Sequence, residues 1–365
     1  MSVDINQPST FQKMVNCTSN DGFRAWINHL GGSVMVSTYQ ANKLAFIGWD
    51  GRQVTLTMRD FDKPMGVAYH NDQILLASRR EITLFSNAKV LAYEYDTKNI
   101  GSYDACYLPR TKWYTGDLNV HDVLFDSQGI LMVNTRFSCL ARPSFRFHFS
   151  PVWQPPFITD IVPEDRCHLN GVTLVDGQPA YVTMLGATDT ARGWSEKKLS
   201  GGVLMDIRTN EVVLEGLCLP HSPRFYRQNL WFLNSGEGEL WVVNPRTKEN
   251  KVVVRLPGYL RGLDFWRDFA IIGLSKIRKH HQISGLPVQK TQNLLCGVAV
   301  VNVLTGNLEG FFEFTEGCEE IYDVRLLPGA RHAAILTPEL PTCHEAITTE
   351  NSSWWLRSHE VNHEK

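Results

Sequence analysis

Residues 170–184 read NGVTLVDGQPAYVTM, two short apolar runs separated by the polar turn VDGQ. Two further runs follow, GVLMDI from residue 202 and EVVLEG from residue 211. Short apolar runs that are bounded by turn residues are typical of β-strands, and tight turns between them are typical of hairpins. The segment therefore predicts four antiparallel strands in a meander.

The opening of this unit recurs along the chain. At six positions a residue is followed by a small one and then by Val, Leu or Pro, with a second apolar run about nine residues from the first residue of the triplet. These anchors are Met65-Gly66-Val67, His121-Asp122-Val123, Asn170-Gly171-Val172, His221-Ser222-Pro223, Arg261-Gly262-Leu263 and Tyr322-Asp323-Val324, at intervals of 56, 49, 51, 40 and 61 residues. Repeats of this length are typical of propeller blades. The sequence thus predicts an all-β fold, a six-bladed β-propeller.

Closure of the ring requires strands from both ends of the chain. The last copy has two clear strands, one from Tyr322 and the run HAAIL from residue 332, so the missing strands are expected from the N-terminus. Residues 33–60 supply three runs, one more than closure needs, which leaves a seventh blade or an extra edge strand open.

The two ends of the chain differ from the repeats. Residues 10–30 predict a short helix with Phe23, Trp26 and Leu30 on one face. The tail beyond residue 338 is polar and aperiodic, and we expect partial disorder there. The predicted organisation is an N-terminal arm and helix over 1–32, the propeller over 33–338 and a C-terminal tail over 339–365.

The composition excludes several classes of function. A formal charge of −2 from 36 basic and 38 acidic residues gives no electrostatic footprint for nucleic acid or an anionic membrane. Neither a signal peptide nor an apolar stretch long enough to span a membrane is found. The eight cysteines form no C-x-x-C pair, so reduced thiols are expected rather than a zinc or redox centre. We expect a cytoplasmic protein that binds neither nucleic acid nor membrane.

The long connections are expected on one face of the disc. In a meander blade, the connection from second to third strand and the connection to the next blade lie on the same side. The long segments assigned to that side are 97–119, 150–168, 187–200 and 275–295, and long loops in a compact domain often form lids or binding loops. Tyr107, Trp113, Trp153 and Trp194 lie in these segments and could roof a site.

Polar residues are expected to ring the axis on the same face, where each innermost strand begins. The anchors place Met65, His121, Asn170, His221, Arg261 and Tyr322 there, with His168 just upstream. Ends of the second strands add residues further out, among them Asn134, Arg136 and Asn234. Such a ring predicts a small-molecule site, although a channel mouth that is merely wet and polar is the simpler alternative.

The chemistry of this ring suits acid–base catalysis. His121 or His221 would act as base, Tyr322 or the other histidine as acid, and Arg261 would hold a carboxylate or a developing enolate. The residues expected to bind substrate are Asn170, His168, Asn134, Arg136, Asn234, Trp194 and Trp113. No cofactor is required.

A metal site is the alternative at the same place. His121, His168 and His221 could supply imidazoles, with Asn170 or Asp323 as oxygen ligands, but no tight spacing such as H-x-x-x-H supports this.

Four motifs carry a family resemblance. STYQANKL from residue 37, HLNGV from residue 168, LPHSPR from residue 219 and LRGLDF from residue 260 resemble a family of uncharacterised bacterial conserved-hypothetical proteins, over residues 22 to 338. In architecture that family is similar to the gluconolactonase and strictosidine-synthase group of six-bladed propellers, whose active sites lie at the axis. The acidic metal set of the lactonases has no counterpart at the anchors. A similar propeller is a cyclase proposed in the making of the pigment scytonemin, which implies a metal-free cyclisation.

Three classes of function follow from these observations. The first is a metal-free lyase or cyclase acting on an aromatic or keto-acid substrate. The second is a metal-dependent, lactonase-like hydrolase at the same mouth. The third is a non-catalytic propeller that binds a protein or a small ligand on its lidded face.

Overall fold

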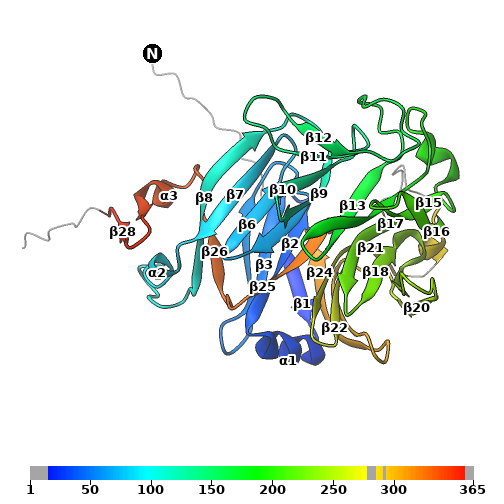
Figure 1. The fold of residues 1–365 in the computed structure, drawn as a ribbon. Coiled ribbons are helices and arrows are strands. Elements are labelled where there is room, and N and C mark those ends of the chain that lie inside the picture. Colours follow the sequence, from blue (N-terminus) through cyan, green and yellow to red (C-terminus); the bar gives the residue numbers. More distant parts are fainter. Residues whose placement is uncertain (1–14, 278–284, 291–292, 358–365) are drawn as a thin grey trace, which may run out of the picture.

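The structure is a computed structural model that describes residues 15–277, 285–290 and 293–357. Six small sheets stand around one axis and form a six-bladed β-propeller (Figure 1). The predicted fold is confirmed, and the described residues form no seventh blade.

Each blade has four strands in meander order, with the innermost strand beside the axis. From the axis outward, the strands of blade 1 are β25 (Asp323–Pro328), β2 (Gly32–Thr38), β3 (Lys43–Trp49) and β4 (Val54–Asp60); of blade 2, β5 (Val67–His70), β6 (Gln73–Ala77), β7 (Glu81–Asn87) and β8 (Ala105–Tyr114); and of blade 3, β9 (Val120–Asp126), β10 (Gly129–Asn134), β11 (Cys139–Arg142) and β12 (Ser150–Trp153). Those of blade 4 are β13 (Leu169–Val175), β14 (Gln178–Met184), β15 (Gly202–Asp206) and β16 (Glu211–Leu217); of blade 5, β17 (Pro220–Tyr226), β18 (Asn229–Asn234), β19 (Glu239–Val243) and β20 (Asn250–Arg255); and of blade 6, β21 (Tyr259–Trp266), β22 (Phe269–Ser275), β23 (Gly297–Asn302) and β24 (Leu308–Glu316).

The ring closes with one C-terminal strand and three N-terminal strands in blade 1. β25 pairs with β2 in antiparallel register from Gly32↔Pro328 to Ser37↔Asp323. The expected second C-terminal strand, HAAIL, is wrong for this blade: its core forms β26 (Ala333–Ile335), which joins β8 of blade 2 in parallel. The seven buried residues of β2 offer a longer partner than this three-residue run. All three N-terminal runs are therefore used in one blade.

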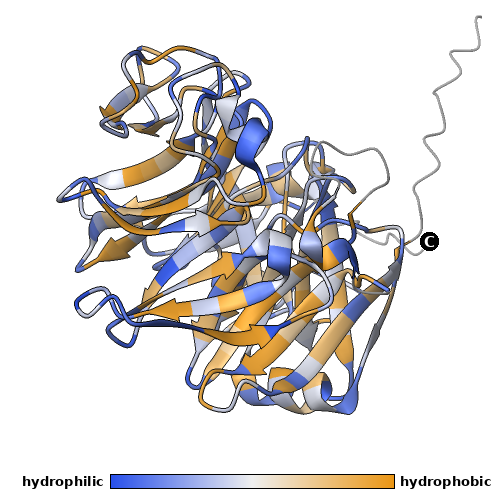
Figure 2. Cartoon of the chain, turned by 90° about the vertical axis from the view of Figure 1, so that its right-hand side faces the viewer, coloured by the Kyte–Doolittle hydropathy of each residue, from blue (hydrophilic) through white to orange (hydrophobic). Residues whose placement is uncertain are grey.

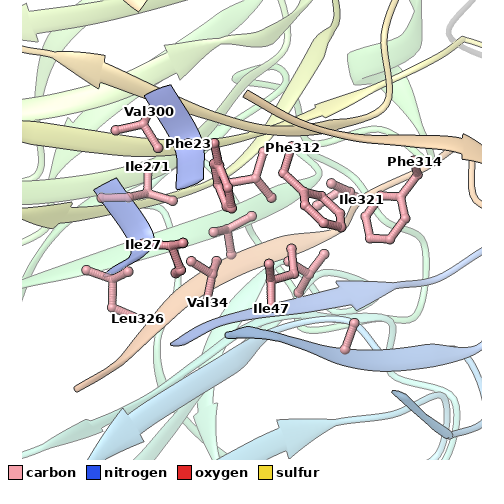
Figure 3. Close-up of a cluster of buried hydrophobic side chains, with 14 of the residues drawn as sticks. Phe23, Ile27, Val34, Ile47, Ile271, Val300, Phe312, Phe314, Ile321 and Leu326 are labelled. Carbon is pink, nitrogen blue, oxygen red and sulfur yellow. The ribbon is translucent and has the colours of Figure 1, made fainter. Parts of the chain in front are cut away.

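The N-terminal helix packs against both blade 1 and blade 6. α1 (Asp21–Leu30) begins at Asn20, whose side chain accepts from the Phe23 N–H, and ends at Gly31, which has φ +65°. Figure 3 shows Phe23 and Ile27 among side chains of both blades, including Val34 and Phe312. The buried face of the helix is as predicted.

The segment just before the helix was predicted wrongly. Residues 16–19 are not helical but form β1 (Asn16–Ser19), a fifth strand at the outer edge of blade 6. Residues 10–14 of the predicted helix lie outside the described part.

Residues 339–357 of the C-terminal segment form regular structure, and partial disorder of this tail stays a prediction. α3 (Pro341–Glu345) leads into the hairpin of β27 (Ala346–Thr348) and β28 (Ser353–Trp355), seen beside blade 2 in Figure 1. Trp355 donates from Nε1 to the carbonyl of Leu91 at 3.2 Å and packs against a cluster that includes Leu108. The apolar residues of this segment are buried only where they meet this cluster, so they follow no strand or helix period in the sequence. Residues 358–365 lie outside the described part.

Three of the four predicted long connections lie on the face where the innermost strands begin, here called the entry face. They are 154–168, 185–201 with the short helix η1 (Gly193–Lys197), and 276–296 with η3 (Pro287–Lys290), of which 278–284 and 291–292 are outside the described residues. A shorter helix, η2 (Ser235–Glu237), joins β18 to β19.

The fourth connection, 97–119, is a wrong prediction. Residues 105–114 form β8, and the long segment before it, with α2 (Lys89–Ala92), links the third strand of blade 2 to the fourth and so lies on the opposite face. As an outermost strand, β8 alternates half-buried and exposed residues from Pro109 to Tyr114, so it lacks a continuous apolar run.

Hydropathy follows this architecture. Figure 2 shows hydrophobic residues concentrated along the strands and hydrophilic residues at many of the connecting turns. The innermost and second strands are largely buried, because blades pack face to face around the axis. Among the described residues, none of the helices has both the length and the apolar character that a membrane crossing demands.

Candidate functional site at the axial mouth

A cavity of about 630 Å³ opens at the entry face of the axis. Its walls come from the starts of innermost strands and from the long connections. They are formed by Tyr39, Asn119, His121, Arg136, Pro163, Glu164, Asp165, His168, Leu185, Arg192, Trp194, Tyr259, Arg261, Ser275, Lys276, Glu320, Ile321 and Tyr322. Below it lies a second pocket of about 10 Å³, here called the axial pocket, which shares His121, Arg261 and Tyr322 and adds His221.

His121 stands at the start of β9 and is 8% exposed. Its Nδ1 lies 3.0 Å from the carbonyl oxygen of Asn119 and 2.8 Å from Oγ1 of Thr135, whose hydroxyl donates to the carbonyl of Leu169. A carbonyl oxygen only accepts, so Nδ1 carries the hydrogen and Nε2 keeps a lone pair. Burial, with the charges of His168 and Arg261, holds the pKa of His121 well below its usual range. The side chain is therefore a neutral base.

His221 repeats this arrangement in blade 5. Its Nδ1 lies 2.9 Å from the carbonyl oxygen of Leu219 and 3.1 Å from Oγ of Ser235. The ring is 4% exposed, and Nε2 has no hydrogen-bond partner among the described residues. Burial and the Arg261 charge hold its pKa well below the usual range. His221 thus presents a second lone pair, in the axial pocket.

Arg261 and Tyr322 supply hydrogen-bond donors beside the two histidines. The guanidinium of Arg261 lies 4.8 Å from the ring centroid of Tyr322 and 5.4 Å from that of Tyr259. Within the described residues, Arg261 forms no ion pair with a carboxylate, and its Nε and the Tyr322 hydroxyl have no hydrogen-bond partner. Burial raises the pKa of Tyr322 well above its usual range, so the hydroxyl stays protonated.

A histidine–aspartate pair forms the opposite wall. His168 contacts Oδ2 of Asp165 through Nδ1 at 2.8 Å, and Trp194 donates to the same oxygen from Nε1 at 3.2 Å. The His168 ring lies 4.7 Å from the His121 ring, edge to face. The carboxylate therefore fixes both the tautomer of His168 and the position of Trp194.

Aromatic rings contact the two histidine rings from both sides of the cavity. Tyr322 lies 5.4 Å from His121 and stacks with Tyr39 at 6.0 Å between centroids. On the other side, Trp194 lies 4.5 Å from His168. Tyr39 and Trp194 thus give the cavity flat apolar surfaces on either side of the histidines.

The comparisons with known proteins give a family and a fold. The model of a family described as "Domain of unknown function (DUF4915)" matches residues 21–336. This chain belongs to the DUF4915 family. No curated protein matches it. The expected relation to a cyclase of pigment synthesis is not tested by these matches and stays a prediction.

Solved structures similar to this DUF4915 chain are propellers. One, titled "Crystal structure of Nidogen/Laminin Complex", has a TM-score of 0.53 and 9% identity, with 81% of this chain and 98% of that chain covered. Another, "Structure of the Neurospora crassa Pan2 WD40 domain", has a TM-score of 0.39 and 12% identity, covering 67% and 64% of the two chains. At this identity the first likeness shows the fold alone, and the second adds no argument.

Several residues predicted at the DUF4915 site serve the scaffold instead. Asn170 borders the axial pocket, but its amide donates to the carbonyl of Pro220 and accepts from Thr183. Asn134 accepts the Phe137 N–H within its blade, whereas Asn234 accepts the Cys218 N–H from the connection between blades 4 and 5 and donates to Glu239. None of the three amides lines the large cavity.

Most of the predicted aromatic roof is also placed elsewhere. Trp113 lies on the outermost strand β8, with its ring 6.4 Å from Phe145. Tyr107 is buried in the same strand, and Trp153 is on β12. Met65 is buried as well. Of the predicted roof, Trp194 lines the cavity, because its connection joins second to third strand.

Other predicted residues do line the cavity, and some lining residues were missed. Arg136 lies on the wall and pairs with Asp117 at 3.1 Å. Tyr39, Asp165 and Tyr259 were not predicted. Tyr259 could have been found from its place two residues before the Arg261 anchor, whereas Asp165 sits in an irregular loop with no sequence signal.

The described residues show no metal centre in the DUF4915 structure. No group of three or more His, Cys, Asp or Glu side chains in this part of the chain is arranged to hold a metal ion. Asp323, one of the suggested oxygen ligands, is 3.4 Å from Arg325 and 3.8 Å from Arg224. Its carboxylate is therefore engaged by guanidinium groups.

A buried ion cluster forms the floor beneath the axial pocket. Arg325 contacts Asp122 at 3.1 Å and Asp323 at 3.4 Å, and Arg224 contacts the same two carboxylates at 3.5 and 3.8 Å. Asp264 lies beside it and accepts from the Leu326 N–H at 2.8 Å. Each aspartate also accepts a backbone N–H of a neighbouring blade, so the cluster ties blades together across the axis.

Proposed function

We propose that this protein is a small-molecule enzyme that works at the entry-face cavity by acid–base chemistry, of the lyase or cyclase type, on an aromatic carboxylate or keto acid. One observation carries the proposal. His221 Nε2, Arg261 Nε and the Tyr322 hydroxyl are polar atoms without partners among the described residues, and all three border the axial pocket. Burying polar atoms without partners is costly, so such a cluster is typical of a site that a ligand completes.

The roles follow from charge and protonation. Arg261 forms no ion pair with a carboxylate among the described residues, although the charge of Glu320 on the cavity wall acts on it, and its guanidinium can hold a substrate carboxylate or a developing enolate. His121 is neutral with a free lone pair, so it can accept a proton. Tyr322 keeps its proton because its pKa is raised, so it can donate a hydrogen bond or a proton. A base and an acid thus stand on adjacent rings.

The walls favour a planar, partly apolar substrate. Trp194 and Tyr39 flank the row of histidine and tyrosine rings, and aromatic faces prefer stacked or edge-on contacts with other rings. A cavity of about 630 Å³ suits a molecule of the size that enzymes commonly enclose.

Binding is tested first, with an aromatic carboxylate and the matching keto acid as probes. We expect 3-phenylpropanoate and phenylpyruvate to raise the melting temperature of the wild type, because ligands that bind only the folded state stabilise it by mass action. Arg261→Gln should remove most of the shift. Arg227→Gln is the matched control, because Arg227 pairs with Asp268 on the surface. Equal shifts in all three proteins would contradict a carboxylate site at Arg261.

Catalysis is tested separately from binding. In heavy water, the wild type should speed the exchange of the C3 hydrogens of phenylpyruvate, as followed by proton NMR, because a general base removes such protons. His121→Gln should abolish the enzymatic exchange and keep the thermal shift, whereas His332→Gln, beside Tyr103 and outside the cavity, should change neither. Binding without exchange in the wild type would favour the non-catalytic binding propeller.

A further inference from the structure

We infer that the cavity selects a carboxylate that bears an adjacent hydroxyl group over the corresponding keto acid, because both axial histidines are locked as hydrogen-bond acceptors. The inference rests on the proposed function and names the substrate class of that site. It depends on Thr135 and Ser235, which are positioning residues outside the large cavity.

The same arrangement of partners holds the Nδ1 hydrogen of both histidines. In blades 3 and 5 a hydroxyl follows the histidine by 14 residues, Thr135 after His121 and Ser235 after His221, and contacts its Nδ1. In both, the carbonyl two residues before the histidine takes the Nδ1 hydrogen.

The backbone that aims these carbonyls is unusual. Asn119 has φ +54° and Leu219 has φ +52°, a left-handed conformation that residues other than glycine seldom adopt. The strain is especially notable at Leu219, since Asn tolerates this region better. Two strained turns that direct a carbonyl to the same ring nitrogen indicate that the tautomer matters.

The tautomers decide which ligand group fits between the rings. His121, His221, Arg261 and Tyr322 border the axial pocket together with Asn170, Ser222 and three residues of the buried ion cluster, and its volume of about 10 Å³ is close to that of one water-sized group. The two Nε2 atoms accept hydrogen bonds, whereas Arg261 Nε and the Tyr322 hydroxyl donate them. A group that both donates and accepts therefore completes this pocket.

The substituents commonly found next to a carboxylate differ in whether they can both donate and accept hydrogen bonds. A keto oxygen only accepts, so it leaves both imidazole lone pairs buried without partners. An ammonium group only donates, so it leaves Arg261 Nε and the Tyr322 hydroxyl without an acceptor. A hydroxyl group donates to an imidazole and accepts from Arg261 or Tyr322. Sites built around a substrate hydroxyl reject analogues that lack it, because their own polar groups are left unpaired.

Four ligands with one aromatic ring test this inference by calorimetric titration. They are 3-phenyllactate, phenylpyruvate, 3-phenylpropanoate and phenylalanine. We expect the hydroxy acid to bind at least about tenfold more tightly than the other three, because each lost hydrogen bond to a buried acceptor weakens binding by about that factor. The keto acid binding as tightly as the hydroxy acid, or more tightly, would overturn the inference and leave the proposed function intact. If none of the four binds, the proposed function itself fails.

The positioning residues are tested through selectivity. Thr135→Val and Ser235→Ala should bring the ratio of hydroxy-acid to keto-acid affinity toward one, and Thr135→Ser should restore it by returning the hydroxyl. Nitrogen-15 NMR of histidine-labelled wild type reads the tautomers without a variant, and should show Nδ1 protonated and Nε2 unprotonated in both rings. Protonated Nε2 in either ring, or an unchanged ratio in folded Thr135→Val and Ser235→Ala, would refute the lock.

Discussion

Two polar clusters lie one above the other on the propeller axis, and they differ in how their groups are satisfied. In the lower cluster, Arg224 and Arg325 contact Asp122 and Asp323, and each aspartate accepts a backbone N–H as well. In the upper one, His221, Arg261 and Tyr322 keep atoms without partners among the described residues. The upper cluster borders the cavity that opens at the entry face, so a ligand can supply the partners that the protein does not.

The contrast separates scaffold from site. A fully paired buried cluster fixes the blades relative to each other, and removal of one partner leaves an uncompensated charge. An unpaired cluster contributes little to the fold and is available to a ligand. At neutral pH, removal of a side chain should therefore change stability more in the lower cluster and ligand binding more in the upper one.

The largest expected effect comes from the lower cluster. Arg325→Met removes a guanidinium that contacts Asp122 and Asp323, and should lower the free energy of unfolding in urea by about 3–5 kcal/mol. The control Arg227→Met breaks an exposed pair with Asp268 and should change the free energy of unfolding far less, because solvent screens an exposed ion pair. Similar losses in the two variants would show that the axial cluster does not hold the blades.

The pH dependence of the lower cluster is next in size. Burial, with the charge of Asp122 adding to it, raises the pKa of Asp323 to about 6. The pKa is about 3.9 in the unfolded chain, so between these values the folded protein holds a proton that the unfolded chain releases. The stability of the wild type relative to Asp323→Asn should therefore fall as pH rises from about 4 to about 6, by on the order of 2 kcal/mol. A flat difference across this range would show that Asp323 is ionised throughout.

The pH dependence of stability due to the upper cluster should have the opposite sign. The pKa of His221 lies well below its usual range because of burial and Arg261, so the unfolded chain binds a proton that the folded protein refuses. The stability of the wild type relative to His221→Gln should fall as pH drops below about 6.5, with a slope of at most about 1.4 kcal/mol per pH unit. The measurement is urea unfolding at a series of pH values. If the difference grew on acidification instead, His221 would be charged in the folded state.

The smallest effect on stability is expected at Tyr322. Its hydroxyl has no partner among the described residues, so Tyr322→Phe should change the free energy of unfolding by less than about 0.5 kcal/mol while weakening the binding of aromatic carboxylates. Thermal unfolding and calorimetric titration check the two parts. A loss of 2 kcal/mol or more would place the hydroxyl in the scaffold and remove the contrast between the clusters.

The sequence by itself determined the propeller fold and the positions where six blades begin, whereas a seventh blade was left open. Strand alternation and turn residues are local, so each anchor could be recognised from a few neighbours, and the start of an innermost strand always faces the axis. His121, Arg261 and Tyr322 were placed at the cavity for this reason, with His168 just upstream.

Tertiary structure decided how the ring closes and which residues complete the cavity. β2 took the place expected for HAAIL because it offers β25 a longer buried partner, a competition between segments nearly 300 residues apart. Asn170 lies at the axial pocket rather than the large cavity, where its amide donates to the carbonyl of Pro220 in the next blade. Tyr39 and Asp165 joined the cavity through loops whose paths depend on packing. Contacts between distant segments have no local signature, so only the assembled propeller reveals them.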